Sequence, residues 1–120
     1  MAKNQETGKL GEDLAVQFLE QQGYRIAARN YRAGRGEIDI IAWAEPQVLV
    51  FIEVKTRQSS AFGGPEEAIH AKKQSLIART AGAYMESIDY QWAIRFDTIA
   101  VLLRPRAAPE IRHYEDAFFP

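Results

Sequence analysis

The sequence predicts one α/β domain in which helices flank a mixed β-sheet, and two patterns support this. Residues 37–42 and 48–55 are apolar, strand-like segments, and Glu45-Pro46-Gln47 between them is typical of a hairpin turn. Segments with the spacing of amphipathic helices precede and follow the hairpin, and two more strand-like segments come last. A chain of 120 residues, 47% of them hydrophobic, can bury one core but not two. We therefore expect residues 1–120 to form a single domain.

The first predicted helix follows a short polar start. Residues 1–6 are expected to fray, Thr7 to cap the helix, and Gly23 to end it after about Gln22. Glu12 falls outside the centre of the apolar stripe, so the spacing by itself favours a solvated glutamate there. The residues expected to form the buried stripe are Leu10, Leu14, Ala15, Phe18 and Leu19.

Two glycines lie inside this predicted helix. Gly8 and Gly11 each cost the helix about 1 kcal/mol relative to alanine. Close packing against the hairpin, or the close approach of a ligand, would account for them.

A strand over residues 24–31 comes next, and residues 32–36 form a basic, glycine-containing loop before the hairpin. Two interpretations of its positive charge remain open. The arginines either keep a strand edge solvated or place guanidinium groups against phosphates. The arginines concerned are Arg25, Arg29, Arg32 and Arg35.

The hairpin places ionisable side chains on otherwise apolar strands. Strand alternation puts Asp39 on one face with Ile38 and Ile40 on the other, and it puts Glu53 and Lys55 on a common face. If the strands pair around the turn, Asp39 lies beside Glu53, and Lys55 follows roughly 7 Å along the strand. Unpaired carboxylates are costly to bury, so this patch requires hydrogen bonds, the lysine or a bound cation. Oxygen ligands suit Mg²⁺ or Mn²⁺, and the chain has no cysteine for a softer site.

Spacing alone also allows a simpler interpretation of the second strand. Glu53 and Lys55 could form an ordinary salt bridge at a strand end, which is the more frequent case for such a pair. Replacing Lys55 by methionine would then leave folding and function nearly unchanged.

The chain after the hairpin predicts a second helix and two strands. A polar loop follows Arg57, and Pro65 is expected to begin the helix at its first turn. Residues 92–103 and 110–114 have the pattern of strands. The helix is expected to direct Ile69, Leu76, Ile77, Thr80, Ala81 and Tyr84 inward and to expose Lys72, Lys73 and Arg79.

Asp97 is the unexpected residue of the longer of these strands. We favour a cross-strand pair with an arginine over a direct role in an active site. His70 and His113 lack the spacing of metal ligands and are expected to be structural or exposed. The apolar tail, residues 117–120, is expected to fold back on the core or to contact a second copy of the chain.

Composition excludes several classes of protein. The absence of cysteine excludes disulfides and fits a reducing compartment. No apolar run of membrane-spanning length and no signal-peptide pattern is present, so we expect a cytoplasmic protein with no membrane partner. A net charge of −1 argues against nonspecific coating of nucleic acid but allows a local basic groove.

The order of the acidic residues resembles a known nuclease pattern. Glu12 on the first helix, Asp39 on a strand and Glu53-Val54-Lys55 on the next strand resemble the active site of the PD-(D/E)XK nuclease superfamily. The blocks GEIDIIA, VFIEVKTR and FGGPEEAI are similar to the YraN-like family of small bacterial proteins, which is similar in turn to archaeal Holliday-junction resolvases. The likeness runs from about Gly8 to Phe118. One difference is that Ile38 stands where many superfamily members have proline before the aspartate.

This resemblance implies a restriction-endonuclease-like fold and a site that hydrolyses DNA with Mg²⁺, for which Mn²⁺ would substitute. It implies that Asp39, Glu53 and the Val54 carbonyl hold the metal, with Glu12 supporting a second or transient ion. Lys55 would orient or deprotonate the attacking water, or stabilise the transition state. We favour the electrostatic role because nearby carboxylates favour the charged ammonium. The residues implied to contact nucleic acid are Arg32, Arg35, Arg57, Lys73 and Gln74.

Three classes of function remain open on this basis. The first is a metal-dependent endonuclease selective for branched DNA, working as a homodimer. The second is a nucleic-acid-binding module of the same fold without catalysis, and the third is a protein-interaction role. Salt-sensitive DNA binding without metal-dependent cleavage would select the second, and no DNA binding at any salt concentration the third.

Overall fold

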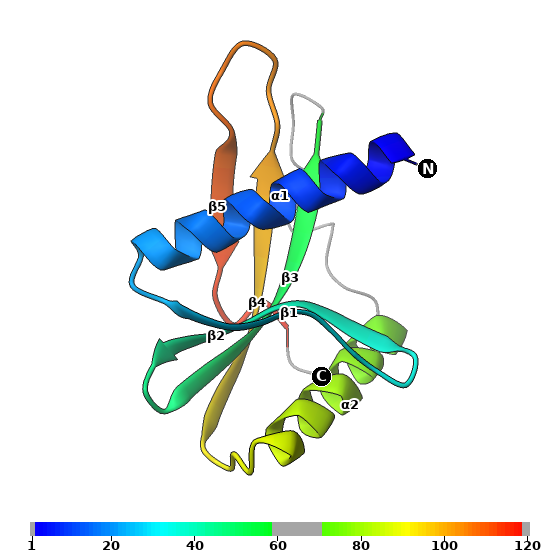
Figure 1. Ribbon diagram of the computed structural model, residues 1–120, viewed down its shortest axis with the longest axis vertical. Coiled ribbons are helices and arrows are strands. Elements are labelled where there is room, and N and C mark those ends of the chain that lie inside the picture. Colours follow the sequence, from blue (N-terminus) through cyan, green and yellow to red (C-terminus); the bar gives the residue numbers. More distant parts are fainter. Residues whose placement is uncertain (1, 59–70, 119–120) are drawn as a thin grey trace.

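The computed structural model describes residues 2–58 and 71–118 and shows one mixed β-sheet between two helices (Figure 1). In the described residues the sheet has five strands in the order β1-β2-β3-β4-β5. Neighbouring strands are antiparallel except β3 and β4, which are parallel. The predicted α/β class and mixed sheet are confirmed. The elements are α1 (Ala2–Gln21), β1 (Arg25–Ala33), β2 (Gly36–Glu45), β3 (Val48–Arg57), α2 (Ala71–Ser87), β4 (Ala93–Leu102) and β5 (Glu110–Tyr114).

Each face of the sheet has its own core. Helix α1 packs on β1, β3 and β4, and α2 packs on β1 and β2. Strand β3 is central and apolar on both sides because helices cover both faces. The α1-side core contains Ala15, Leu19, Ile40, Ala42, Val50, Ile52, Ile99 and Val101, and the α2-side core contains Ile38, Ile41, Leu49, Phe51, Ile77, Ala81, Tyr90 and Phe118.

Helix α1 starts earlier than predicted. It begins at Ala2, so Thr7 lies inside the helix and is not its N-cap, and the expected fraying of residues 1–6 is wrong for residues 2–6. No glycine or proline stands in this segment to stop the helix from extending upstream. The predicted stop is confirmed, since Gly23 has φ 94° and the Tyr24 amide donates to the Leu19 carbonyl at 2.9 Å.

The predicted stripe of α1 is confirmed except at Leu10, because its other four residues lie in or against the α1-side core. Leu10 is 48% exposed, whereas Glu12 is 8% exposed. A Cβ at Gly11 would collide with the Thr56 side chain of β3, while nothing lies within 4 Å of the corresponding position at Gly8. Close packing against β3 therefore explains Gly11 and turns the neighbouring Glu12 inward.

The loop expected over residues 32–36 is shorter in the structure. Arg32 and Ala33 belong to β1 and Gly36 to β2, which leaves a two-residue turn of Gly34 and Arg35. Gly34 takes φ 57°, a conformation that tight hairpin turns require and that glycine adopts without strain.

Strand β4 carries a buried ionic cluster. Asp97 is 0% exposed and binds Arg95 Nη2 at 2.9 Å on its own strand, so the expected cross-strand arginine is wrong. Residues two apart on a strand share a face, which is why the arginine comes from β4 itself. The cross-strand partner is His113 of β5, whose Nε2 lies 2.7 Å from Asp97 Oδ2.

The end of the chain returns to the core at Phe118, which is 5% exposed and whose ring lies 5.4 Å from that of Phe96. The expected fold-back of the tail is confirmed for this residue. The predicted start of the second helix at Pro65, with Ile69 and His70, lies outside the described residues. Among the described residues, no helix is long and apolar enough to cross a bilayer.

Candidate active site

Strands β2 and β3 separate at the carboxylates. Their paired register ends at Ile40 and Ile52, one residue before Asp39 and Glu53. Beyond this point the Val54 amide donates to Asp39 Oδ2 at 2.8 Å, so a side chain accepts the hydrogen bond that the neighbouring backbone no longer receives. In Figure 1 the β1–β2 hairpin end extends toward α2, whereas β3 continues past α1.

The side-chain alternation of β2 is interrupted at the same place. Ile40 lies in the α1-side core, but Ile38 lies with Ile41 in the α2-side core. The prediction that Ile38 and Ile40 share a face is therefore wrong. In a regular strand the Asp39 side chain would point to one face of the sheet. The break in alternation between Ile38 and Ile40 instead places it between the two faces.

Asp39 and Glu53 are brought together as predicted. The pKa of Asp39 is raised to about 7. Burial is the largest cause, and the Glu53 carboxylate contributes through its charge and through a hydrogen bond, while the Val54 amide opposes the rise. Glu53 is 8% exposed and its Oε1 lies 3.1 Å from Lys73 Nζ on α2. The site therefore holds two close carboxyl groups, of which Glu53 is buried and Asp39 partly buried, with one ammonium group beside them.

Lys55 lies one side-chain repeat beyond Glu53 on β3. Burial lowers the pKa of the Lys55 ammonium, the charges of Arg57 and Lys73 lower it further, and Glu53 opposes them. The expectation that nearby carboxylates favour the charged form holds for Glu53 alone, because burial and the cations outweigh it. The Lys55 ammonium therefore releases its proton more readily than an ordinary lysine does.

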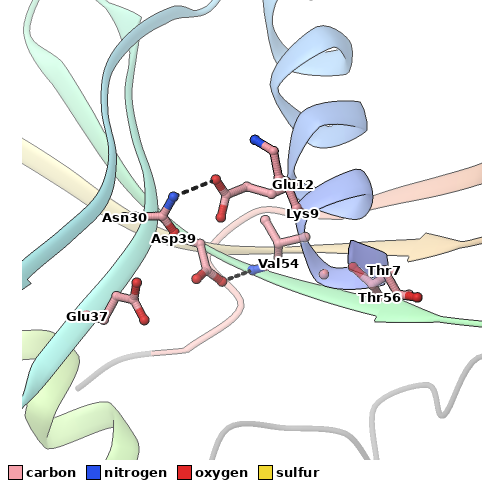
Figure 2. Close-up of a pocket in the computed structure, with 9 residues that line it drawn as sticks. Thr7, Lys9, Glu12, Asn30, Glu37, Asp39, Val54 and Thr56 are labelled. Atoms are coloured by element: carbon pink, nitrogen blue, oxygen red, sulfur yellow. Dashed lines mark hydrogen bonds between the residues drawn. The ribbon is translucent and has the colours of Figure 1, made fainter. Parts of the chain in front are cut away.

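Glu12 reaches the site from α1 and is held by residues of β1. Its Oε1 accepts hydrogen bonds from Arg29 Nε at 3.0 Å and Nη2 at 2.8 Å. The same oxygen accepts a hydrogen bond from Asn30 Nδ2 at 3.0 Å (Figure 2). Arg29 also binds Asp13 Oδ1 at 2.6 Å. The solvated interpretation of Glu12 is wrong, and Arg29 is tied to α1 by these ion pairs.

Two cavities meet at Asp39 and Glu37. The cavity on the α1 side has a volume of about 640 Å³ and appears in Figure 2. The cavity on the α2 side has a volume of about 620 Å³. The α1-side cavity is lined by Thr7, Gly8, Lys9, Glu12, Asn30, Glu37, Asp39, Val54 and Thr56, and the α2-side cavity by Arg35, Gly36, Glu37, Asp39, Glu53, Lys72, Lys73, Leu76 and Ile77.

The basic residues expected to contact nucleic acid are only partly brought together. Arg35 and Lys73 line the α2-side cavity, beside Lys72. Arg32 instead pairs with Glu37, with Nε 3.3 Å from Oε2. Arg57 Nη1 donates to the Thr56 carbonyl at 3.0 Å, and Gln74 is half-buried on α2, lining neither cavity.

The acidic pair fits a small divalent cation by its chemistry. Carboxylate oxygens are hard ligands, and Mg²⁺ is commonly held by one or two carboxylates while keeping several waters. The described residues contain no group of three or more acidic, histidine or cysteine side chains placed to hold a metal. The fit therefore rests on Asp39 and Glu53, with Glu12 across the α1-side cavity.

Sequence reasoning missed Asn30. It lies in β1 with φ 52° and lines the cavity with Glu12 and Asp39. The available signal was an asparagine within a strand pattern, since asparagine accepts a left-handed backbone more readily than other side chains.

The family model and the curated relatives that match this chain belong to one family. The family described as "Uncharacterised protein family UPF0102" matches residues 11–101. A UPF0102 protein of Flavobacterium psychrophilum is 44% identical over 119 residues, covering 99% of this chain and 98% of the relative. One of Chlorobaculum tepidum is 50% identical over 109 residues, covering 90% and 84%. A solved Holliday junction resolvase of Archaeoglobus fulgidus is similar at 18% identity and a TM-score of 0.41, covering 87% of this chain and 74% of that one.

Proposed function

The chain belongs to the UPF0102 family, the YraN-like family that its sequence blocks resemble, and we propose that it is a metal-dependent endonuclease that hydrolyses phosphodiester bonds in DNA. One observation carries this proposal. Asp39 and Glu53 meet at the point where β2 and β3 separate, where burial and mutual repulsion raise the pKa of Asp39 to about 7. A cation relieves both penalties. The resemblance of Asp39 and Glu53-Val54-Lys55 to the PD-(D/E)XK pattern supplies the reaction class.

The acidic residues would hold the metal. Asp39, Glu53 and the Val54 carbonyl are the proposed ligands of Mg²⁺, with Mn²⁺ as a substitute, and Glu12 would support a second or transient ion. The bound metal supplies Lewis-acid activation of water and of the scissile phosphate. Lys73 already places an ammonium 3.1 Å from Glu53, which supports the preference of this pair for a cation.

The basic residues would act on the substrate. Lys55 would hold or accept the proton of the attacking water, consistent with burial lowering the pKa of its ammonium. Arg35 and Lys73 line the α2-side cavity and would bind phosphates next to the reacting one. Arg32, Arg57 and Gln74 line neither cavity and would contact the DNA backbone that flanks the reacting phosphate.

The finer part of the proposal concerns the substrate and the assembly. The sequence resemblance to resolvase-like nucleases leads us to propose branched DNA as the preferred substrate and a homodimer as the working form. A dimer would present one site to each of two of the four strands of a four-way junction.

Cleavage of labelled DNA tests the proposal. Four-way-junction, flap and linear duplex substrates are incubated with Mg²⁺, Mn²⁺ or EDTA. Cleavage is expected to require metal and to fall by about 100-fold or more in Asp39→Asn and in Lys55→Ala, because each removes a group that acts in the transition state. Arg79→Ala is the matched control, since Arg79 is an exposed cation on α2 that lines neither cavity.

A second function is favoured by one specific observation. In the part of the chain that the structure describes, Glu53 is already paired with Lys73, and no three-residue metal group is formed. Both features are expected of a nucleic-acid-binding module of this fold that binds no metal and does not cleave DNA. Salt-sensitive junction binding with no cleavage in any metal, and with no effect of Asp39→Asn, would select this function. No DNA binding at any salt concentration would select a protein-interaction role.

A further inference from the structure

Asn30 has an unusual backbone for a strand residue. It lies inside β1 with φ 52°, in the left-handed region. L side chains disfavour this region, and asparagine tolerates it best after glycine. Contacts between Asn30 and neighbouring residues must therefore offset the cost of this backbone conformation.

The position of Asn30 in the sheet coincides with the displaced carboxylate. Arg29 pairs with Ile40 and Tyr31 pairs with Ile38, so Asn30 stands opposite Asp39. The interruption of side-chain alternation in β2 occurs at this same rung. The left-handed residue and the carboxylate that lies between two cavities are thus cross-strand neighbours.

The side chain of Asn30 reaches the third acidic residue. Its Nδ2 donates to Glu12 Oε1, the oxygen that also accepts both hydrogen bonds from Arg29. In the described part of the chain, no hydrogen bond or ion pair engages Oε2 of Glu12. Figure 2 shows the Glu12 carboxylate beside Asn30, at the cavity that Asp39 also lines. One oxygen is therefore anchored while the other stays available to a ligand.

We propose that Asn30 is a positioning residue of the active site, which anchors Glu12 Oε1 so that Oε2 faces a divalent cation in the α1-side cavity. This inference rests on the proposed metal-dependent function. Partners that orient a metal ligand typically affect metal affinity by about 10-fold or more, although they do not touch the metal.

Asparagine combines two properties that other residues separate. Glycine would keep the left-handed backbone and lose the amide donor. Aspartate would tolerate the backbone but place a second negative charge against Glu12. Alanine would lose the donor and disfavour the backbone as well. Asn30→Gly is therefore the informative substitution, because it removes the contact while preserving the fold.

A double-mutant cycle on Mn²⁺ affinity tests the inference, with free Mn²⁺ measured by electron paramagnetic resonance. Asn30→Gly is expected to weaken Mn²⁺ binding by about 10-fold with little change in the thermal unfolding midpoint. In a Glu12→Gln background, Asn30→Gly is expected to have no further effect, because Asn30 acts through Glu12. Asp89→Gly is the matched control, since Asp89 has φ 53° in a turn outside both cavities and should leave affinity unchanged.

The outcomes separate this inference from the proposed function. An equal loss of affinity in both backgrounds, or no loss in either, would overturn the role of Asn30 and leave the metal site standing. If the unsubstituted protein binds no Mn²⁺, the metal-dependent function fails, and the positioning role of Asn30 fails with it. The Asn30 side-chain amide signals in the metal-free NMR spectrum then show whether the contact itself exists. They are expected to shift in Glu12→Gln, and unmoved signals would show that Asn30 does not hold Glu12.

Discussion

Asp39 contacts both the backbone of β3 and a second carboxyl group. Its Oδ2 accepts the Val54 amide where β2 and β3 part, and its carboxyl group lies against Glu53. Burial raises the pKa of Asp39 first, and the like charge of Glu53 raises it further, to about 7. Ionising Asp39 at neutral pH therefore opposes folding unless a cation is present.

The pH dependence of stability follows from this raised pKa. Because the folded protein binds this proton more tightly than the unfolded chain does, the stabilising contribution is complete below pH 3.8 and is lost as pH rises through about 7. Asp39→Asn should therefore be more stable than the unsubstituted protein in EDTA at pH 8, by about 2 kcal/mol. The two should be equally stable near pH 4.

Urea unfolding at pH 4, 6 and 8, with and without Mn²⁺, checks this expectation. Mn²⁺ should reverse the order at pH 8, because it stabilises only the protein that keeps Asp39. Asp89→Asn is the control for removing an exposed aspartate. Equal stability of Asp39→Asn and the unsubstituted protein in EDTA at pH 8 would contradict the raised pKa.

At the scale of the element, the packing of α1 on β3 decides which α1 residues face the site. Gly11 lets the helix approach Thr56, and the same contact brings Glu12 inward. The helix is thereby aligned along the part of β3 that follows Glu53. The short Gly34-Arg35 turn also shapes the site. Because it keeps β1 and β2 paired as far as Ala33 and Gly36, Asn30 lies opposite Asp39 within the paired strands.

A matched pair of glycine substitutions tests this packing. Gly8→Ala should raise the stability of the fold by roughly 0.5–1 kcal/mol, because alanine favours the helix and open space surrounds the new methyl group. Gly11→Ala has the same helix advantage but should destabilise the fold by about 1–3 kcal/mol, because its methyl group collides with Thr56. Thermal unfolding of both variants gives the comparison, and a stabilising Gly11→Ala would show that α1 does not lie this close to β3.

At the scale of the whole molecule, ionic groups divide between the two faces of the sheet. Asp97 pairs in register with Ile52 and lies on the α1 side with Ile99, whereas Glu53 faces α2. Burial alone would raise the pKa of Asp97, but hydrogen bonds from His113 and Arg95 outweigh it and hold that pKa below its usual value. Arg95 Nη2 also donates to the Tyr24 hydroxyl at 2.7 Å, which links β4 and β5 to the start of β1. This cluster joins distant parts of the chain and lies apart from the candidate site.

Asp97→Asn should therefore lower the stability of the domain without changing the site. A loss of about 3 kcal/mol is expected at pH 7, because the largely buried Arg95 then keeps, among the described residues, only the 3.7 Å ionic contact with the exposed Glu115 carboxylate. The contribution of Asp97 is present above pH 3.8 and is lost as pH falls through its lowered pKa, so the difference between the proteins should shrink in acid. Urea unfolding measures the loss, and Mn²⁺ affinity of the folded variant should be unchanged. A weakened Mn²⁺ affinity would instead assign Asp97 to the active site.

The sequence by itself determined the features that depend on neighbouring residues. Period-2 alternation around Glu45-Pro46-Gln47 was enough to place Asp39 beside Glu53 in a hairpin, and Gly23 was enough to end the first helix. The family is likewise carried by contiguous blocks of residues. These signals are local, because strand alternation and helix capping are set by backbone geometry within a few residues.

Only the tertiary structure decided which way the borderline side chains face. Helical spacing put Leu10 in the core and Glu12 outside it, and the close approach at Gly11 reversed both. The break in alternation at Asp39, the left-handed Asn30 beside it and the same-strand partner of Asp97 depend on contacts between distant segments. The physical reason is that packing against distant segments decides which face of a helix and which end of a strand is buried. The residue pattern of one segment carries no information about that packing.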